Sequence, residues 1–222
     1  MPDIKVNHNY FSAPNANMAY IMGFLAADGN VQEKGNRIQS QLSIIDKDQL
    51  IKIQKEIGGC EVYEYNSNGY PCCGWHCYSA QIKRDLSMYG IVPHKTGHIY
   101  ISSLLPKEYW RDFIRGYFDG DGSIYKDGNG IRLSITSANI EILKDINTFF
   151  QENGIKSSNL YNDHNNKDIR FRTQSCIDIY NLLYYPECLC LSRKKKKYLT
   201  LIKEKYGSKR LCNFPKEVEE VC

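Results

Sequence analysis

The chain has 222 residues, 42% of them apolar and 24% charged, which excludes a disordered or fibrous protein. Its formal net charge of +4 permits a nucleic-acid partner without requiring one. The cysteines number nine and the N-terminus has no apolar secretory segment, so we expect reduced thiols in a cytoplasmic or nucleoid compartment, and no apolar run is long enough to span a membrane.

The predicted elements follow one order that occurs twice along the chain. Each unit begins with an apolar helix, continues through a polar stretch, an alternating strand, a helix that stops at glycine and two more strands, and closes with a helix. In the first unit these segments cover residues 20–31, 37–44, 46–59, 61–65, 74–80 and 82–90. After a Pro- and Gly-containing connection at 94–110, the second unit covers residues 113–124, 131–136, 139–155, 158–162, 168–174 and 176–185.

This repeat predicts an α+β fold with two pseudo-symmetric halves, each of the order helix, two strands, helix, two strands, helix. Residues 10–100 form the N-terminal half, residues 101–206 the C-terminal half, and residues 207–222 a tail. A duplicated domain with a purely structural role would show the same order. The choice between the two interpretations therefore depends on the motif inside the repeat.

The repeated motif reads IMGFLAADG in one half and IRGYFDGDG in the other. Its small residues are four positions apart, a spacing that places them on one face of a helix and lets two helix backbones approach closely. The expected helix-interface residues are Gly23, Ala27, Gly116 and Gly120. If the two helices pack against each other, the acids near their C-terminal ends meet.

Those acids, Asp28 and Asp121, are each followed by a glycine. Two carboxylates beside two helix C-termini form a strongly negative spot, which a cation would neutralise. An all-oxygen environment near phosphate favours Mg²⁺. A simple helix cap and turn also explains a single Asp-Gly pair, but two copies in the same register favour the metal site.

The two motifs resemble those of the LAGLIDADG homing endonuclease family in its monomeric, double-motif form, and the resemblance covers roughly residues 18–206. It implies that each half places a saddle-shaped antiparallel sheet on DNA and that both strands of a long target are cut across the minor groove. It also implies that Asp28 and Asp121 bind two or more Mg²⁺ ions, helped by the backbone carbonyls of Ala27 and Gly120. Mn²⁺ or Ca²⁺ could occupy the same sites.

The resemblance suggests further catalytic residues. A basic residue after the last helix of each half helps to organise water in the family, and Lys95 and Lys194 match that position. A polar residue at the end of the second strand holds solvent near the metal; Asp46 and Ser137 stand there in place of the more familiar glutamine. Ala26 replaces the first Asp of the family name, which is not the metal ligand, so we expect activity to survive it.

The predicted strands suggest how DNA would be read. A two-stranded ribbon fits the major groove, and one phase of each strand is polar, with Arg and Gln that pair with G and A. An ordinary solvated sheet face would alternate in the same way. The predicted DNA-binding residues are Gln32, Lys34, Arg37, Gln39, Gln41, Ser43, Tyr63, Tyr65, Tyr125, Arg132, Ser134, Tyr161, Arg170, Arg172 and Gln174.

Other signals are weaker. The group Cys72, Cys73, His76 and Cys77 lacks the second, well-spaced pair of a structural zinc site. Most of the basic run 193–197 is expected to contact phosphates or solvent, with only Lys194 near the chemistry. The alternative to a nuclease is a nucleic-acid-binding protein without cleavage activity, such as an intron RNA maturase or a transcription regulator.

Overall fold

The computed structural model describes residues 4–95, 97–156, 158–163 and 166–206; the predicted tail lies outside them. The first half contains α1 (Ala16–Asp28), β1 (Gly29–Val31), β2 (Arg37–Ser43), α2 (Lys47–Ile57), β3 (Tyr63–Ser67), β4 (Tyr70–Tyr78) and α3 (Ala80–Met88). The second contains α4 (Trp110–Asp121), β5 (Gly122–Asp127), β6 (Gly130–Ser137), α5 (Ile140–Glu152), β7 (Leu160–Asp163), β8 (Asn166–Arg172), α6 (Thr173–Leu183) and α7 (Ser192–Tyr206). The predicted order is confirmed through α3 in the first half and through α6 in the second, and α7 is an additional helix that closes the second half.

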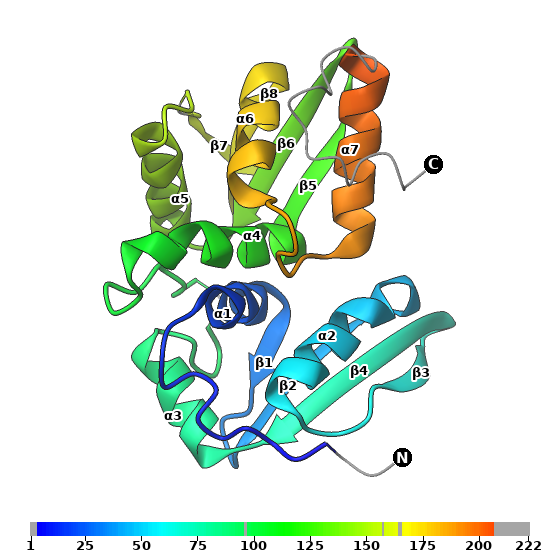
Figure 1. The fold of residues 1–222 in the computed structure, drawn as a ribbon, viewed down its shortest axis with the longest axis vertical. Helices are drawn as coiled ribbons and strands as arrows, with labels where there is room; N and C mark the ends of the chain where they lie inside the picture. The colour runs from blue at the N-terminus through cyan, green and yellow to red at the C-terminus, as the bar shows by residue number, and fades with distance from the viewer. Residues whose placement is uncertain (1–3, 96, 157, 164–165, 207–222) are drawn as a thin grey trace.

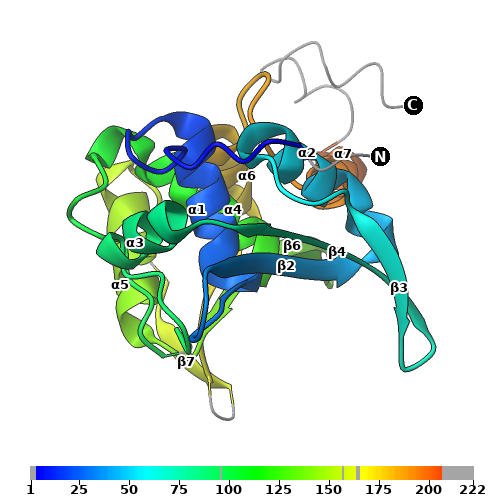
Figure 2. The ribbon, with the colours of Figure 1, turned by 90° about the horizontal axis from the view of Figure 1, so that it is seen from below.

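Each half has a four-stranded antiparallel sheet with the same topology. The strand orders are β1-β2-β4-β3 and β5-β6-β8-β7. One face of each sheet is apolar and is covered by helices; in Figure 2, α2, α6 and α7 lie on one side of β2, β4 and β6. The other face is polar. The α+β fold with two similar halves is therefore confirmed.

Alternation along β6 shows why the sheets have two different faces. Ile131, Leu133 and Ile135 are buried, whereas the residues between them are partly exposed. Because successive side chains of a strand point to opposite faces, the apolar set forms the core and the polar set remains accessible. In β2 the buried phase includes Ser40, whose hydroxyl donates to the carbonyl oxygen of Asp28 at 3.3 Å.

Several boundaries differ from the sequence prediction, among them the start of one strand and the end of another. The strand expected at 74–80 begins at Tyr70, because Asn68 and Gly69 both adopt positive φ angles, of 52° and 87°, and form the two-residue turn of a hairpin. The strand expected at 168–174 ends at Arg172. Gln174 lies in the first turn of α6, where its amide donates to Asp178 at 3.0 Å, so its assignment to a strand was wrong.

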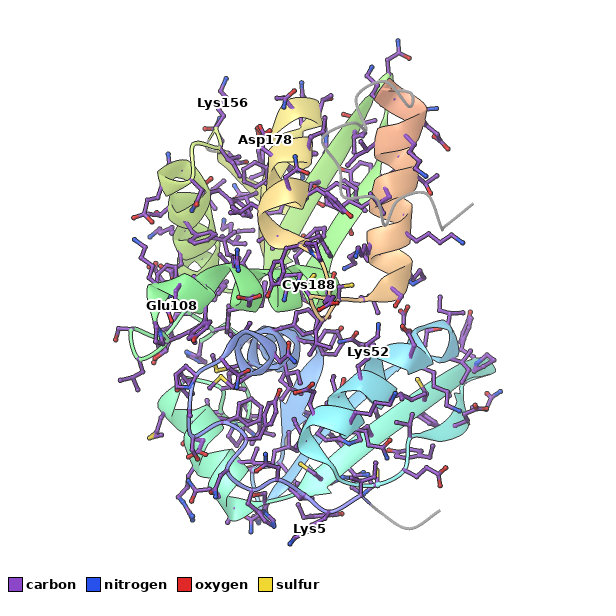
Figure 3. The ribbon with its side chains drawn as sticks, in the orientation of Figure 1. Lys5, Lys52, Glu108, Lys156, Asp178 and Cys188 are labelled. Atoms are coloured by element: carbon purple, nitrogen blue, oxygen red, sulfur yellow. The ribbon has the colours of Figure 1, made fainter. Side chains whose placement is uncertain are left out.

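Helices α1 and α4 lie at the boundary between the halves (Figure 1). Both are buried over most of their length. On one side of this pair, the α6–α7 connection contacts the first half: Lys52 of α2 donates to the carbonyl oxygen of Cys190 and to Ser192, at 2.9 and 2.7 Å. In Figure 3, Cys188 lies above the boundary between the halves and Lys52 below it. These contacts connect the halves and hold the start of α7.

Candidate metal and nucleic-acid site

The two central helices touch backbone to backbone at their glycines. A Cβ atom added to Gly23 would overlap the carbonyl oxygen of Phe113 and lie 3.0 Å from the nitrogen of Tyr117. A Cβ added to Gly116 would overlap the carbonyl oxygen of Tyr20. One turn further on, a Cβ at Gly120 would overlap that of Ala27. The four predicted interface residues therefore lie where only small side chains fit.

This close approach brings the two motif acids to one place. Asp28 ends α1 and Asp121 ends α4. A carboxylate oxygen of Asp28 would be 3.2 Å from a Cβ at Gly120, next to Asp121. Both side chains are open to solvent, yet the protein packed around Asp28 and the charge of Asp121 raise the pKa of Asp28 to about 6. Surrounding protein also raises the pKa of Asp121.

A lysine lies beside each acid and contacts the end of its helix. The ammonium of Lys95 donates to the carbonyl oxygen of Gly29 at 2.6 Å and lies 3.4 Å from that of Ala27. The Lys194 ammonium donates to the equivalent Gly122 at 2.6 Å and lies 3.4 Å from Gly120. Burial lowers the pKa of both lysines, that of Lys194 to about 8. The site therefore has two-fold similarity in its bases as well as its acids.

The two lysines are not equivalent in burial. Lys194 is 7% exposed and also donates to the carbonyl oxygens of Phe118 and Asp119, both at 2.7 Å. Lys95 is only half-buried. Lys194 thus satisfies the last carbonyls of α4 in addition to facing the acids.

The different burial predicts different stability effects. Lys194→Ala should lower the free energy of unfolding by about 1–3 kcal/mol, because several buried carbonyl oxygens lose their donor. Lys95→Ala should cost less, and Lys196→Ala, on the exposed side of α7, should be neutral. Urea denaturation of the three variants measures this ranking. Equal costs for Lys194→Ala and Lys196→Ala would contradict it.

The donor set fits a hard divalent cation. Two carboxylates lie at the ends of two helices, and the carbonyl oxygens of Ala27 and Gly120 each accept only a long contact from a lysine. Oxygen donors of this kind, on side chains that are open to solvent, suit Mg²⁺, Mn²⁺ or Ca²⁺. Asp28, Asp121, Ala27 and Gly120 are thus the residues that could hold metal ions here.

Ser137 and Asp46 are placed differently, although the resemblance implies the same role for both. The Tyr117 hydroxyl lies 3.0 Å from Ser137 Oγ and within hydrogen-bonding reach of Asp121. Asp46 is buried and forms a two-pronged ion pair with Arg193, both contacts at 2.8 Å. Ser137 therefore connects to the acids through Tyr117, while Asp46 joins the first half to α7.

The polar face of the first sheet carries amides and aromatic rings. By strand register, Arg37 lies opposite Tyr78, and Gln39 opposite His76. Gln41 lies opposite Gly74, where a Cβ would be only 2.5 Å from the ring of Tyr63, so this glycine lets the tyrosine lie across the strand. Ser43 and Tyr65 share this face, and Gln32 and Lys34 are exposed in the β1–β2 turn.

The polar face of the second sheet is dominated by guanidinium groups. Arg132 lies opposite both Tyr125 and Arg172, and Ser134 opposite Arg170. Arg170 is 4.8 Å from the ring centroid of Tyr161. Arg132, Arg170 and Arg172 line a cleft of about 620 Å³ together with Tyr161 and Gln174. Although Gln174 is helical, it remains at the edge of this surface.

Sequence reasoning missed three kinds of residue. His76 and Tyr78 share a face with Gln39 and Arg37, which the alternation of β4 could have shown once its register was known. Tyr117 takes the motif position of Phe24, and only the packing shows that its hydroxyl reaches Asp121. Arg193 was expected to contact phosphate or solvent, but it binds Asp46; no local pattern signals an ion pair between the halves.

The part of the chain that the structure describes contains no group of three or more His, Cys, Asp or Glu side chains arranged to hold a metal ion. Cys72 and Cys73 are adjacent on β4, so they point to opposite faces of its sheet. In the same described residues, no helix has the length and apolar character needed to cross a membrane.

Comparisons with known proteins agree with this architecture. Residues 108–212 match the family model of the LAGLIDADG-like domain. An uncharacterized protein of Methanocaldococcus jannaschii, MJ0314, is 24% identical over 178 residues, which are 73% of this chain and 62% of that protein. The chain thus spans less than two thirds of this relative's length.

Solved structures show the same fold at low sequence identity. I-SmaMI bound to an uncleaved DNA target with calcium ions has a TM-score of 0.58 and 13% identity, over 94% of this chain and 96% of that one. I-GzeII in complex with its DNA target has a TM-score of 0.56 and 12% identity, over 94% of this chain and 95% of that one. Full-length DUF199/WhiA from Thermatoga maritima has a TM-score of 0.58 and 14% identity, over 89% of this chain and 64% of that one. Residues 108–212 thus contain a LAGLIDADG-like domain, and the chain as a whole has the two-half LAGLIDADG fold.

Proposed function

We propose that this protein is a site-specific, metal-dependent DNA endonuclease that cuts both strands of a duplex across the minor groove. The observation that carries the proposal is the meeting of Asp28 and Asp121 at the ends of two closely packed helices, with Lys95 and Lys194 beside them. The polar faces of the two sheets carry Gln and Arg side chains, which could hydrogen-bond base edges. Several proteins of similar fold have been solved on DNA targets, which supports double-stranded DNA as the partner.

The chain's own residues would position the reacting groups. Asp28, Asp121 and the carbonyl oxygens of Ala27 and Gly120 would hold Mg²⁺, which when bound neutralises charge on the scissile phosphate and activates water. The ammonium groups of Lys95 and Lys194 add positive charge where the DNA backbone would lie. Their hydrogen bonds to helix-end carbonyls fix that charge before the substrate binds, which lowers the cost of reorganisation. The two sheets would set the register of the duplex over this site.

Because both motifs are in one chain, the paired acids need no second copy, and we propose that the active form is a monomer in a reducing compartment. Size-exclusion chromatography with light scattering tests whether the protein is a monomer.

A randomised duplex library, incubated with Mg²⁺ and sequenced at the ends produced, tests the activity. The proposal predicts one cut position within a long shared sequence. Binding to a selected duplex without any cleavage would contradict it.

A second function has its own support. Lys95 and Lys194 counterbalance the acids without metal, and the fold is as similar to DUF199/WhiA as to I-SmaMI. The first point favours a protein that binds nucleic acid without cutting it, such as a transcription regulator or an intron RNA maturase, and the fold is compatible with either function. Binding to intron RNA, with no end produced from the DNA library, would favour this alternative.

The raised pKa of Asp28 predicts how pH acts on the site. Cleavage should decrease as pH falls through 6, because a protonated carboxyl group does not bind metal. Without metal, the free energy of unfolding should respond in the opposite direction. The folded protein binds this proton more tightly than the unfolded chain does. Protonation of Asp28 therefore contributes more to the free energy of unfolding as pH falls from about 7 to about 4. Because Asp28 is solvent-exposed, we expect this contribution to the free energy of unfolding to be less than about 1 kcal/mol.

Thermal melts of metal-free wild-type protein and Asp28→Asn between pH 7.5 and 5 measure this contribution. The wild type should gain more stability on acidification than the variant. Identical pH dependence in the two proteins would show that Asp28 does not have a raised pKa.

A further inference from the structure

The polar faces of the two sheets differ in chemistry although their topology is the same. The first face presents a single arginine, Arg37, together with Gln39 and Gln41 and the aromatic side chains of Tyr63 and His76. These two rings lie edge to face, with centroids 5.9 Å apart. The second face presents three arginines. A duplex lying across both sheets would therefore meet amides and rings on one side and guanidinium groups on the other.

Two arginines of the second face are held in place by carboxylates. Arg132 Nη2 lies 2.5 Å from Asp127, and Arg170 Nε lies 2.7 Å from Asp168. Arg170 also stacks near the ring of Tyr161. Asp168 is 4% exposed, so its position is fixed by the sheet itself. The orientation of these guanidinium groups is thus set before any ligand binds.

This arrangement suits base edges better than phosphates. A nearby carboxylate cancels much of an arginine's charge, which weakens its attraction to a phosphate. Fixing the planar fork, however, lowers the entropy cost of a two-point hydrogen bond. In the major groove, the partner that accepts two hydrogen bonds from arginine is guanine, whereas glutamine pairs with adenine in the same manner.

We propose that the DNA target is asymmetric, with guanines in the half-site under the second sheet, read by Arg132, Arg170 and Arg172, and adenines in the half-site under the first, read by Gln39 and Gln41. This inference rests on the DNA-binding part of the proposed function. It does not depend on cleavage. It assigns the base composition of each half-site to a particular half of the chain.

The test is a binding selection with the full chain, carried out with Ca²⁺ in place of Mg²⁺ on a randomised duplex library. The selected sites should contain a guanine-enriched half and an adenine-containing half. Arg170→Lys should reduce the preference for guanine at one position of the guanine-enriched half-site by about tenfold or more. It should not change the base preferences in the adenine-containing half-site. Gln39→Ala should reduce the preference for adenine at one position of the adenine-containing half-site only. Lysine keeps the positive charge beside Asp168, so folding is preserved.

A second variant separates base reading from phosphate binding. Asp127→Asn raises the net charge by one and releases Arg132, and Asp127 is 44% exposed on its side chain. If Arg132 reads a base, this variant should lose discrimination at one guanine while binding random DNA at least as tightly. Glu141→Gln, the same charge change on α5, should leave discrimination unchanged.

The outcomes are distinguishable. Selected sites without a guanine bias in one half, or Asp127→Asn with unaltered discrimination, would overturn the inference and leave the nuclease proposal standing. Failure to bind any duplex would overturn both. Selected sites that are cut when Mg²⁺ replaces Ca²⁺ would support the proposed function independently.

Discussion

Asp28→Asn and Asp121→Asn are each expected to reduce cleavage of the selected duplex by more than about a hundredfold, while affinity for the same duplex in Ca²⁺-free buffer is retained. Mutation of groups that merely support a metal ligand typically costs 10- to 100-fold, so loss of a ligand should cost more. Asparagine keeps the shape of aspartate but lacks the negative charge. Because the raised pKa shows that the negative charge is unfavourable in the folded protein, removing it should not lower the free energy of unfolding.

Single-turnover cleavage and a gel-shift titration on the same duplex measure the two effects separately. Glu141→Gln on α5 is the matched control, because it also removes one negative charge, at an exposed position away from the central helices; it should cleave normally. Either site variant cutting both strands at the wild-type rate would show that the two acids do not form the metal site.

Gly116→Ala is expected to lower the free energy of unfolding by at least about 1–3 kcal/mol, the usual cost of overpacking. In an ordinary helix interior the same change would stabilise by roughly 0.5–1 kcal/mol, because glycine loses more backbone entropy on folding. The sign reverses here because the added methyl group meets the backbone of Tyr20 and Phe24 rather than a flexible side chain. Gly23→Ala should behave alike, against the backbone of Phe113.

A swap at the next turn of the helices provides the control. Gly120→Ala should also destabilise, but its methyl group meets the Cβ of Ala27, which Ala27→Gly removes. The double variant should therefore recover most of the lost stability, apart from the helix propensity of the moved alanine. No rescue, or a stable Gly116→Ala protein, would contradict the packing of α1 against α4.

The parts of this molecule that repeat could be predicted from the sequence. The period of the motif gave the two halves, and the four-residue spacing of small side chains gave the contact between α1 and α4, because both depend on residues close together in the chain. The alternation of β6 gave its two faces for the same reason. The hairpin at Asn68–Gly69 also has a local signal, the Asn-Gly pair, which was overlooked.

Contacts between distant segments could not be predicted in this way. The ion pair of Asp46 with Arg193 and the hydrogen bonds of Lys52 with the α6–α7 connection join residues about 140 positions apart. The end of β8 was also not predicted, because residues 173–174 continue the alternating pattern of the strand but belong to α6. The link from Ser137 through Tyr117 to Asp121 likewise requires the folded structure.

The central claim is that two acids from different halves hold divalent ions jointly over one DNA site. The most direct measurement is a crystal structure of the full chain with its selected duplex and Mn²⁺, located by anomalous scattering. Anomalous peaks bound by both Asp28 and Asp121 and by a backbone phosphate would agree with the claim. Bound DNA with the two carboxylates apart, or with Mn²⁺ elsewhere, would contradict it.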